Sequence, residues 1–336
     1  MSLKHCIAII GAGSWGTGLS IVAARAGHEV RLWSRDPEIV GSINKQRVNP
    51  KYLTFAAIPN DVSATADIAD AFAGASILVI AAPSHAVRQL LQQNSSAVDR
   101  ETVVVSAAKG IEVESGKRIS EIVAEVLDED SQQRFVCLSG PSFAEEVVNN
   151  HPTAIVAASV NPDTAQIVQR ALSFNSLRIY TNTDVVGTEL GGAVKNVMAI
   201  AAGMVSGLGF GSNSLAALIT RGLAEIARLA LFQGAHLETM MGLAGLGDLV
   251  LTCTGKLSRN RFVGEQLGKG KSLSEITAGM NEVAEGIKTT LAVQQLAHRA
   301  GLEMPITNEV KAVLYDGKSV RAAVEDLMRR PLKDEK

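Results

Sequence analysis

The stretch "CIAIIGAGSWGTGLSIVAARAG", residues 6–27, decides the fold of the N-terminal half. A short apolar run is followed by Gly11, Gly13 and Gly16 in the spacing GxGxxG, and then by an amphipathic helical pattern. Between a strand and a helix, the first glycine permits a tight turn, the second lets the backbone approach a pyrophosphate, and the third lets the helix pack on the strand. The stretch therefore predicts a dinucleotide-binding unit; the alternative is a glycine turn that serves packing alone.

Apolar runs of strand length continue through the first half of the chain, separated by segments of helix length: "EVRLW", "ILVIAA", "TVVVSAA", "FVCLSG" and "AIVAAS". Runs that are apolar on both faces are typical of a parallel sheet covered by helices. After "LRIYTNTD" the β-branched runs end and helical spacing continues. We therefore expect a doubly wound (Rossmann) parallel sheet domain over residues 1–187 and an all-helical domain over residues 188–336.

The composition limits the classes of partner. The 336 residues include 32 Lys+Arg and 34 Asp+Glu, a formal net charge of -2. The chain therefore lacks the overall positive field that gathers nucleic acid or anionic lipid. Its three cysteines, Cys6, Cys137 and Cys253, lie in apolar runs without CxxC spacing. We expect no nucleic-acid partner, no disulfide framework, no metal site and a reducing compartment.

No segment of the sequence is expected to cross a membrane. The N-terminal apolar run is too short for a signal peptide and continues directly into the glycine turn. The longest candidate span, residues 189–219, is interrupted by Lys195, Asn196 and several glycines. These features favour a soluble, cytoplasmic protein.

The end of the second expected strand, "HEVRLWSRD" (28–36), bears on the choice of cofactor. An NAD site usually places an acidic residue there to accept hydrogen bonds from the ribose, whereas a 2′-phosphate requires a guanidinium. The chain offers Ser34 and Arg35, which favours NADP(H) without excluding NAD(H) and makes FAD the weaker candidate. Asp36 is the competing acid, but an aspartate directly before Pro37 is more typical of a helix N-cap.

Polar groups recur beyond the ends of later strands. Lys109 in "AAKGIE" and Gly140 and Ser142 in "GPSFAEE" follow apolar runs, at the sheet edge where open α/β folds bind ligands. Further on, Ser258, Arg259 and Asn260 stand at an expected helix start, where exposed N–H groups and a guanidinium suit a phosphate. The alternatives are a surface lysine at position 109 and a solvated basic turn around Arg259.

Lys195 lies within "ELGGAVKNVMAIAAGM" (189–204), a segment of helical spacing made almost entirely of small or apolar residues. Its helical neighbours are Gly191, Gly192, Met198 and Ala199, so little bulk surrounds it. An ammonium in such surroundings fits a general acid–base catalyst; the alternative is a side chain that extends to solvent. Asp248, an acid among Gly, Leu and Val, needs either a partner or a chemical role.

These blocks, in this order, resemble the bacterial type of NAD(P)-dependent glycerol-3-phosphate dehydrogenase over residues 5–315. Blocks such as "GLAGLGDLVLTCT" are far more specific than a glycine fingerprint. The resemblance implies reversible reduction of dihydroxyacetone phosphate to sn-glycerol 3-phosphate, a precursor of glycerophospholipids. It also implies a helical domain of the 6-phosphogluconate-dehydrogenase type. One local departure is Thr54-Phe55, where the family pattern tends to have proline and glycine, and this leaves the conformation of that loop open.

The resemblance also implies residue roles. Lys195 matches the proton donor and acceptor, with Asp248 as the acid that orients it. The positions expected to line the substrate are Lys109, Gly140, Ser142, Lys195, Asp248, Ser258, Arg259 and Asn260. Those expected around the cofactor, besides the three glycines, are Ser14, Trp15, Arg35, Lys109, Ala144, Arg259, Val283 and Glu285.

Two other functions stay open at this point. A related 3-hydroxy-acid or 6-phosphogluconate-type dehydrogenase has the same two-domain plan and also uses a helix lysine followed by asparagine. A non-catalytic nicotinamide sensor needs the cofactor site but no Lys195–Asp248 pair. The apolar helical domain is compatible with a homodimer.

Overall fold

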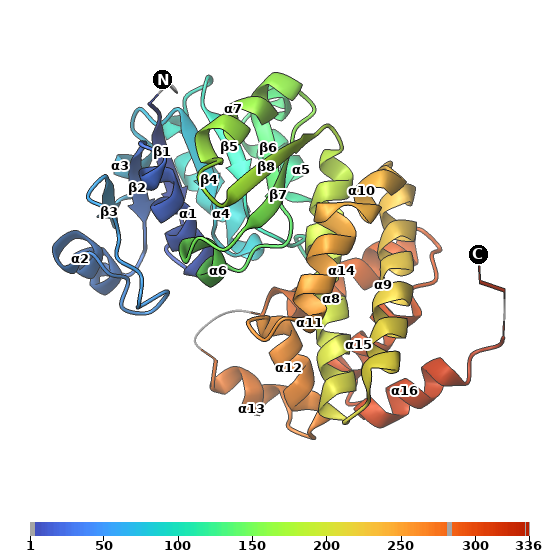
Figure 1. Ribbon diagram of the computed structural model, residues 1–336. Coiled ribbons are helices and arrows are strands. Elements are labelled where there is room, and N and C mark those ends of the chain that lie inside the picture. Colours follow the sequence, from blue (N-terminus) through green and yellow to red (C-terminus); the bar gives the residue numbers. More distant parts are fainter. Residues whose placement is uncertain (1–3, 281–283, 333, 336) are drawn as a thin grey trace. The chain divides into compact units, whose positions relative to one another are not determined.

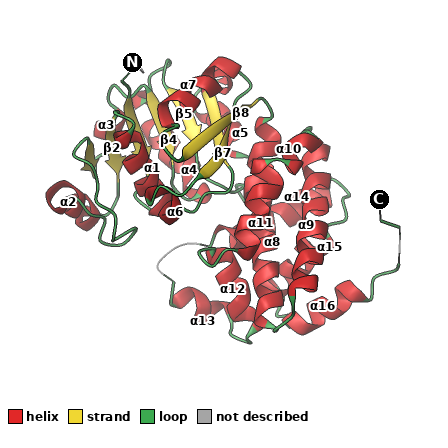
Figure 2. Cartoon of the chain, viewed as in Figure 1, coloured by secondary structure: helices red, strands yellow, loops and turns green. Residues whose placement is uncertain are grey.

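The computed structural model describes residues 4–280, 284–332, 334 and 335 (Figure 1). The chain divides into two compact units. The first comprises Met1–Lys109 and Lys117–Glu189, and the second comprises Gly110–Gly116 and Leu190–Lys336. Strands occur in the first unit, while the second is built of helices (Figure 2).

The first unit contains one eight-stranded sheet with strand order β3-β2-β1-β4-β5-β6-β7-β8. The strands are β1 (Cys6–Ile10), β2 (Glu29–Trp33), β3 (Val62–Thr65), β4 (Ile77–Ile80), β5 (Val103–Ser106), β6 (Phe135–Ser139), β7 (Thr153–Ala158) and β8 (Leu177–Asn182). Their pairing is parallel except between β6 and β7, which run antiparallel. The expected doubly wound parallel sheet is confirmed, and β6 with β7 is its one antiparallel pair among the described strands.

Helices pack on both faces of this sheet. The helices of the first unit are α1 (Ser14–Arg25), α2 (Pro37–Gln46), α3 (Ile68–Phe72), α4 (Val87–Asn94), α5 (Ile119–Val126), α6 (Ala144–Val148) and α7 (Pro162–Leu172), with short 3-10 turns η1 (Ser84–Ala86), η2 (Ser95–Ala97) and η3 (Glu129–Arg134). Ile7 and Ile9 of β1 join a buried cluster with α1, α2 and α7, whereas Ala8 and Ile10 join another with α3. Because successive strand residues face opposite sides, these two clusters confirm a doubly wound sheet.

The second unit is a helical assembly. Its elements are α8 (Val185–Gly207), α9 (Ser212–Phe232), α10 (Leu237–Met241), the π-helical turn η4 (Leu243–Gly247), α11 (Asp248–Thr254), α12 (Arg259–Gly268), α13 (Leu273–Ala278), α14 (Glu285–Arg299), α15 (Pro305–Tyr315) and α16 (Val320–Met328). Segment 110–116 belongs to this unit as well: a Cβ on Gly116 would lie 3.1 Å from the Leu296 side chain of α14.

The boundary expected after residue 187 falls inside α8, whose first turns belong to the sheet unit. The reason is the buried carboxylate of Glu189. It accepts hydrogen bonds from the Ser120 backbone N–H at 2.8 Å and from Arg118 Nη1 at 2.9 Å, at the start of α5. Burial raises the pKa of Glu189, while Arg118 and Ser120 oppose that shift. This contact fixes the first part of α8 to the sheet unit.

The glycines of α8 are packing residues. A Cβ on Gly203 would lie 2.0 Å from the Arg261 carbonyl oxygen, and one on Gly264 of α12 would lie 1.9 Å from the Ile200 carbonyl oxygen. The two helices therefore meet backbone to backbone, which only glycine allows. By length and composition α8 passes a test for a membrane-spanning helix, yet 89% of its most apolar window is buried inside the protein. This burial is typical of a core helix.

Candidate active site

The glycine turn has the shape that a dinucleotide requires. Gly11 has φ +115°, and a Cβ there would lie 2.9 Å from the Ala81 backbone, while one on Gly16 would lie 1.8 Å from the Gly11 carbonyl oxygen. A Cβ on Gly13 would meet nothing within 4 Å. Gly13 is also the N-cap of α1 and brings no side chain to the first N–H groups of that helix. Two glycines thus serve packing and the third leaves a helix N-terminus open, as a pyrophosphate site needs.

The end of β2 carries the predicted cofactor-selecting residues. Asp36 is the N-cap of α2, and its Oδ1 accepts from Glu38 N–H at 3.0 Å, so the interpretation of Asp36 as a helix cap is confirmed. Ser34 is buried and its hydroxyl accepts from Asp36 N–H at 3.2 Å, whereas Arg35 is exposed. Of these three residues, Arg35 is the one whose side chain extends toward solvent.

The other predicted cofactor residues of this unit lie at helix starts. Ser14 and Trp15 begin α1, and the half-buried Trp15 packs against the main core cluster of the sheet. Ala144 begins α6 and faces α1, because a Cβ on Gly18 would lie 3.4 Å from the Ala144 Cβ.

Lys109, Gly140 and Ser142 come together, although the chain separates them. The Gly140 carbonyl oxygen accepts from Lys109 Nζ at 3.0 Å and from Ser142 Oγ at 3.1 Å. Gly140 has φ +134°, and a Cβ there would lie 2.9 Å from the Ile155 Cα, so no larger residue fits. The half-buried Lys109 is thus held by a carbonyl oxygen beyond the carboxyl ends of β5 and β6, and its predicted contact with ligands stays a prediction.

Lys195 is buried in the helical unit and held by two oxygens. Its Nζ donates to Asp248 Oδ1 at 2.6 Å and to Thr252 Oγ1 at 2.7 Å, and Lys195 and Asp248 are only 6% and 1% exposed. Thr252 in turn donates to the Asp248 carbonyl oxygen at 2.6 Å, which aims an oxygen lone pair at the ammonium. The alternative that Lys195 extends to solvent is wrong.

The glycine-rich block before Asp248 explains how this acid reaches Lys195. Residues Leu243–Gly247 form a single π-helical turn, and a Cβ on Gly245 would lie 2.1 Å from the Met240 carbonyl oxygen. Gly191 of α8 is equally constrained, because its Cβ would lie 2.5 Å from the Ala244 carbonyl oxygen. The backbone of η4 therefore packs against the glycine face of α8. Asp248 is the next residue after η4, which brings its carboxylate near Lys195.

Ser258 and Arg259 form the start of α12. Ser258 is buried and caps the helix at the start that the sequence predicted, its Oγ accepting from Arg261 N–H at 3.2 Å. Arg259 is exposed as the first residue of the helix.

Asn260 connects three helices. Its Nδ2 donates to Asn196 Oδ1 at 2.9 Å, and its Oδ1 accepts from Gly286 N–H at 2.9 Å. Asn196 neighbours Lys195 on α8, and Gly286 follows Glu285, the first residue of α14. The side chain of Asn260 thus serves the protein's own packing, and its predicted contact with substrate stays a prediction. Val283 lies outside the described residues.

Two residues of the site were not predicted from the sequence. Thr252 stands one helical turn after Asp248, a spacing that signals a shared face. Asn49 is fully buried and donates to the Ala12 carbonyl oxygen at 3.0 Å and to Thr17 Oγ1 at 2.9 Å, so it fastens the loop after α2 to the glycine turn. No periodic pattern marks Asn49. The loop around Thr54 is a turn in which Ala56 N–H donates to the Leu53 carbonyl oxygen at 2.8 Å.

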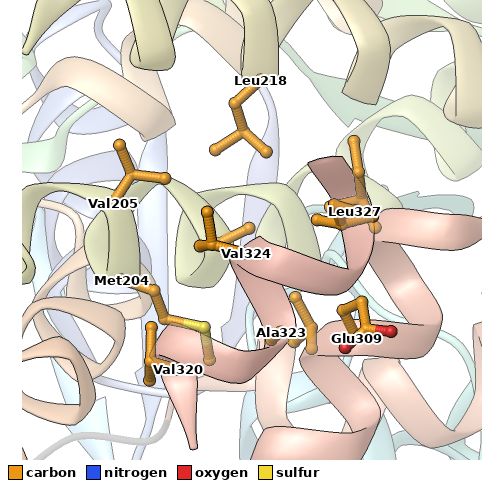
Figure 3. A pocket seen from close by; sticks show the side chains of 11 residues that line it. Met204, Val205, Leu218, Glu309, Val320, Ala323, Val324 and Leu327 are labelled. Carbon is orange, nitrogen blue, oxygen red and sulfur yellow. The ribbon is translucent and has the colours of Figure 1, made fainter. Parts of the chain in front are cut away.

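Other features of the structure do not compete with this chemistry. A cavity of about 40 Å³ in the helical unit is lined by apolar side chains of α8, α9, α15 and α16 together with the Glu309 carboxylate (Figure 3), an unsuitable wall for an anionic substrate. Burial raises the pKa of the Cys253 thiol to about 12, so this neighbour of Thr252 stays protonated. Among the residues that the structure describes, no three His, Cys, Asp or Glu are grouped to hold a metal ion.

Family models for the two halves of NAD-dependent glycerol-3-phosphate dehydrogenase match this sequence. The N-terminal model matches residues 6–165 and the C-terminal model matches residues 184–325. The chain belongs to the NAD-dependent glycerol-3-phosphate dehydrogenase family. The resemblance drawn from blocks such as "GLAGLGDLVLTCT" is thereby confirmed.

Relatives in this family match the chain over almost its whole length. The glycerol-3-phosphate dehydrogenase [NAD(P)+] of Koribacter versatilis is 53% identical, with 97% of each chain covered, and that of Citrifermentans bemidjiense is 50% identical, with 98% of each covered. The crystal structure of glycerol-3-phosphate dehydrogenase from Coxiella burnetii has a TM-score of 0.93 at 40% identity, covering 97% of this chain and 99% of that one. A D-mandelate dehydrogenase, at 13% identity and a TM-score of 0.61, shares the fold alone.

Proposed function

We propose that this protein catalyses the reversible reduction of dihydroxyacetone phosphate to sn-glycerol 3-phosphate with NADPH or NADH. The observation that carries the proposal is the buried Lys195–Asp248–Thr252 cluster, in a chain whose other unit has an open dinucleotide turn at Gly13. Family membership supports the same substrate and cofactor class. A sensor without catalysis has no use for a desolvated lysine held by two oxygens.

The residues of the chain divide the chemical work. The nicotinamide, when bound, supplies a hydride to the carbonyl carbon. Lys195 donates a proton from Nζ to the carbonyl oxygen as negative charge develops there, and it takes the proton back in the oxidation direction. Asp248 and Thr252 orient the ammonium, and the Asp248 carboxylate balances its charge, which burial would otherwise penalise.

Binding of the phosphate is assigned to the start of α12. Arg259 offers a guanidinium, and the N-terminal turn behind Ser258 offers backbone N–H groups, both of which suit a phosphate dianion. Lys109, Gly140 and Ser142 are assigned to the rest of the substrate. Gripping the phosphate, away from the reacting carbon, would align the carbonyl oxygen with Lys195.

The nucleotide contacts are assigned to the sheet unit, with Ser14, Trp15, Arg35 and Ala144 around the glycine turn. Lys109, Arg259, Val283 and Glu285 complete the proposed set. We place the enzyme in the cytoplasm, where the free thiols of Cys6, Cys137 and Cys253 persist, and in the supply of glycerophospholipid precursors.

The test is the loss of reduced-nicotinamide absorbance when the purified protein is mixed with dihydroxyacetone phosphate and NADPH or NADH. Dihydroxyacetone without phosphate is the matched substrate. We expect NADPH or NADH to be oxidised with dihydroxyacetone phosphate but much more slowly with dihydroxyacetone. We expect Arg259→Ala to lose this preference for the phosphorylated ketone. Equal rates on the two ketones would contradict the role of Arg259, and oxidation with neither would overturn the proposed reaction.

A further inference from the structure

Four charged side chains gather where β2 ends. Lys51 Nζ lies 2.7 Å from Asp36 Oδ2 and 3.0 Å from Glu38 Oε2, and Arg35 directly precedes Asp36 in the chain. The two carboxylates would repel a 2′-phosphate at this strand end, where a dinucleotide-binding fold places the adenosine ribose. Lys51 pairs with both carboxylates and offsets one of their two negative charges.

Asp36 makes three hydrogen bonds within the protein. Its Oδ1 caps α2, its Oδ2 accepts from Lys51, and its own N–H donates to Ser34 Oγ. The hydrogen bond from Lys51 holds the pKa of Asp36 below its usual value, so the carboxylate stays charged. An acid committed to a helix cap and an ion pair is poorly placed to accept from ribose hydroxyls, as an NAD-selecting acid would.

Hydrogen bonds through Asn49 connect the backbone of Lys51 to the glycine turn. Its backbone N–H donates to Asn49 Oδ1 at 3.1 Å, and the amide nitrogen of the buried Asn49 donates to the Ala12 carbonyl oxygen at 3.0 Å. Ala12 stands between Gly11 and Gly13. The loop that carries Lys51 is thus tied to the glycine turn, while the Lys51 ammonium lies against Asp36 just after β2.

We propose that Lys51 is a specificity-determining residue that favours NADP(H) over NAD(H), because its ammonium pairs with Asp36 and Glu38 beside Arg35 and so weakens their repulsion of the 2′-phosphate. The assignment rests on the proposed function, because it needs the nucleotide to lie along the glycine turn. The 2′-phosphate carries nearly two negative charges and NAD(H) has none at that position. Removing the Lys51 charge should therefore weaken the binding of NADPH more than the binding of NADH.

The test is the dissociation constant of NADPH and of NADH, measured by calorimetric titration of the intact protein at low ionic strength. In Lys51→Gln we expect NADPH to bind about fivefold more weakly, since the interaction is exposed and partly screened, while NADH changes less than about twofold. The matched control is Lys45→Gln, an exposed lysine of α2 that removes the same charge. It should leave both constants unchanged.

A rescue variant separates charge from structure. Adding Asp36→Asn and Glu38→Gln to Lys51→Gln removes the repelling carboxylates, and asparagine keeps the helix cap. NADPH affinity should return to within about twofold of the parent protein. Equal weakening of both nucleotides, no weakening at all, or no rescue would overturn the role of Lys51 while leaving the dehydrogenase intact. A parent protein that binds neither nucleotide would instead overturn the nucleotide site and this assignment with it.

Discussion

Removing either partner of the Lys195–Asp248 pair leaves a charge that water cannot reach. Asp248 is 1% exposed and its Oδ1 lies 2.6 Å from Lys195 Nζ. Breaking a buried pair costs far more than the pair contributes net, since the remaining charge is desolvated without compensation. Such a pair is therefore better explained by chemistry than by stability.

Asp248→Asn, which preserves shape, should lower the free energy of unfolding by about 3 kcal/mol. It should also reduce kcat by at least about tenfold because the ammonium loses its orientation and charge balance. Urea unfolding and steady-state kinetics measure the two effects. Asp316→Asn is the control, since the Asp316 carboxylate is 51% exposed in its pair with Lys311 and should cost less than about 1 kcal/mol. If Asp248→Asn and Asp316→Asn had equally small effects on the free energy of unfolding and on kcat, the proposed importance of the buried Lys195–Asp248 pair would be contradicted.

At the residue level, the sequence is most informative where a polar side chain interrupts an apolar pattern. Lys195 and Asp248 stand out for this reason, and the structure joins them. Thr252 and Asn49 do not stand out, because a threonine or an asparagine is ordinary in a helix or a loop. Their roles depend on what the fold brings within hydrogen-bond distance, which no periodicity encodes.

At the level of elements, glycine sets the distance between α8 and α12. Gly264→Ala would place a Cβ against the Ile200 carbonyl oxygen and should lower the free energy of unfolding by about 3 kcal/mol. The matched control is Gly41→Ala in α2, where a Cβ meets nothing within 4 Å. There the better helix propensity should raise stability by up to about 1 kcal/mol. Thermal unfolding that finds both substitutions neutral would exclude the close crossing.

His28 joins two elements, and its protonation is expected to destabilise the sheet unit in acid. It is buried, its Nε2 lies 2.9 Å from the Ala171 carbonyl oxygen of α7, and its Nδ1 accepts from His5 N–H at 3.2 Å. Burial lowers the pKa of His28 from 6.5. As the pH falls through 6.5, the unfolded chain takes up a proton before the folded one does, so stability decreases.

The expected result is that wild-type protein loses more stability between pH 7.5 and pH 5.5 than His28→Gln, which has no titratable group and keeps an N–H donor for Ala171. Urea midpoints at the two pH values give the comparison. A variant that loses as much stability as the wild type would show that His28 is not the responsible group.

For three strands the sequence pattern is not sufficient to predict either the direction or the existence of the strand. Both β6 and β7 are apolar, so burial identifies each as a strand but says nothing of its direction. Their antiparallel pairing, with Cys137 opposite Ala158, depends on contacts between the two strands that this pattern does not encode. Likewise, β3 has only four residues and two exposed or half-buried positions, too weak a pattern to predict.

For the molecule as a whole, β-branched strand patterns end near residue 187 and helical spacing follows. This change of pattern predicts where the sheet ends and the helices begin, but it does not predict how the chain divides into two units. Segment 110–116 joins the helical unit through Gly116, and α8 starts in the sheet unit through Glu189. Both depend on contacts between distant parts of the chain. The two-unit plan of the family and its glycine turn, by contrast, can be predicted from local sequence patterns.

The most direct measurement is the single-turnover rate of nicotinamide oxidation by Lys195→Ala with dihydroxyacetone phosphate, with NADPH binding measured in the same preparation. Lys288→Ala, which changes an exposed lysine of α14, is the control. If Lys195 is the proton donor, the variant binds NADPH normally and oxidises it at least about 10²-fold more slowly, while Lys288→Ala matches the wild type. A Lys195→Ala protein that binds NADPH and turns over within a few-fold of the wild type would contradict that role.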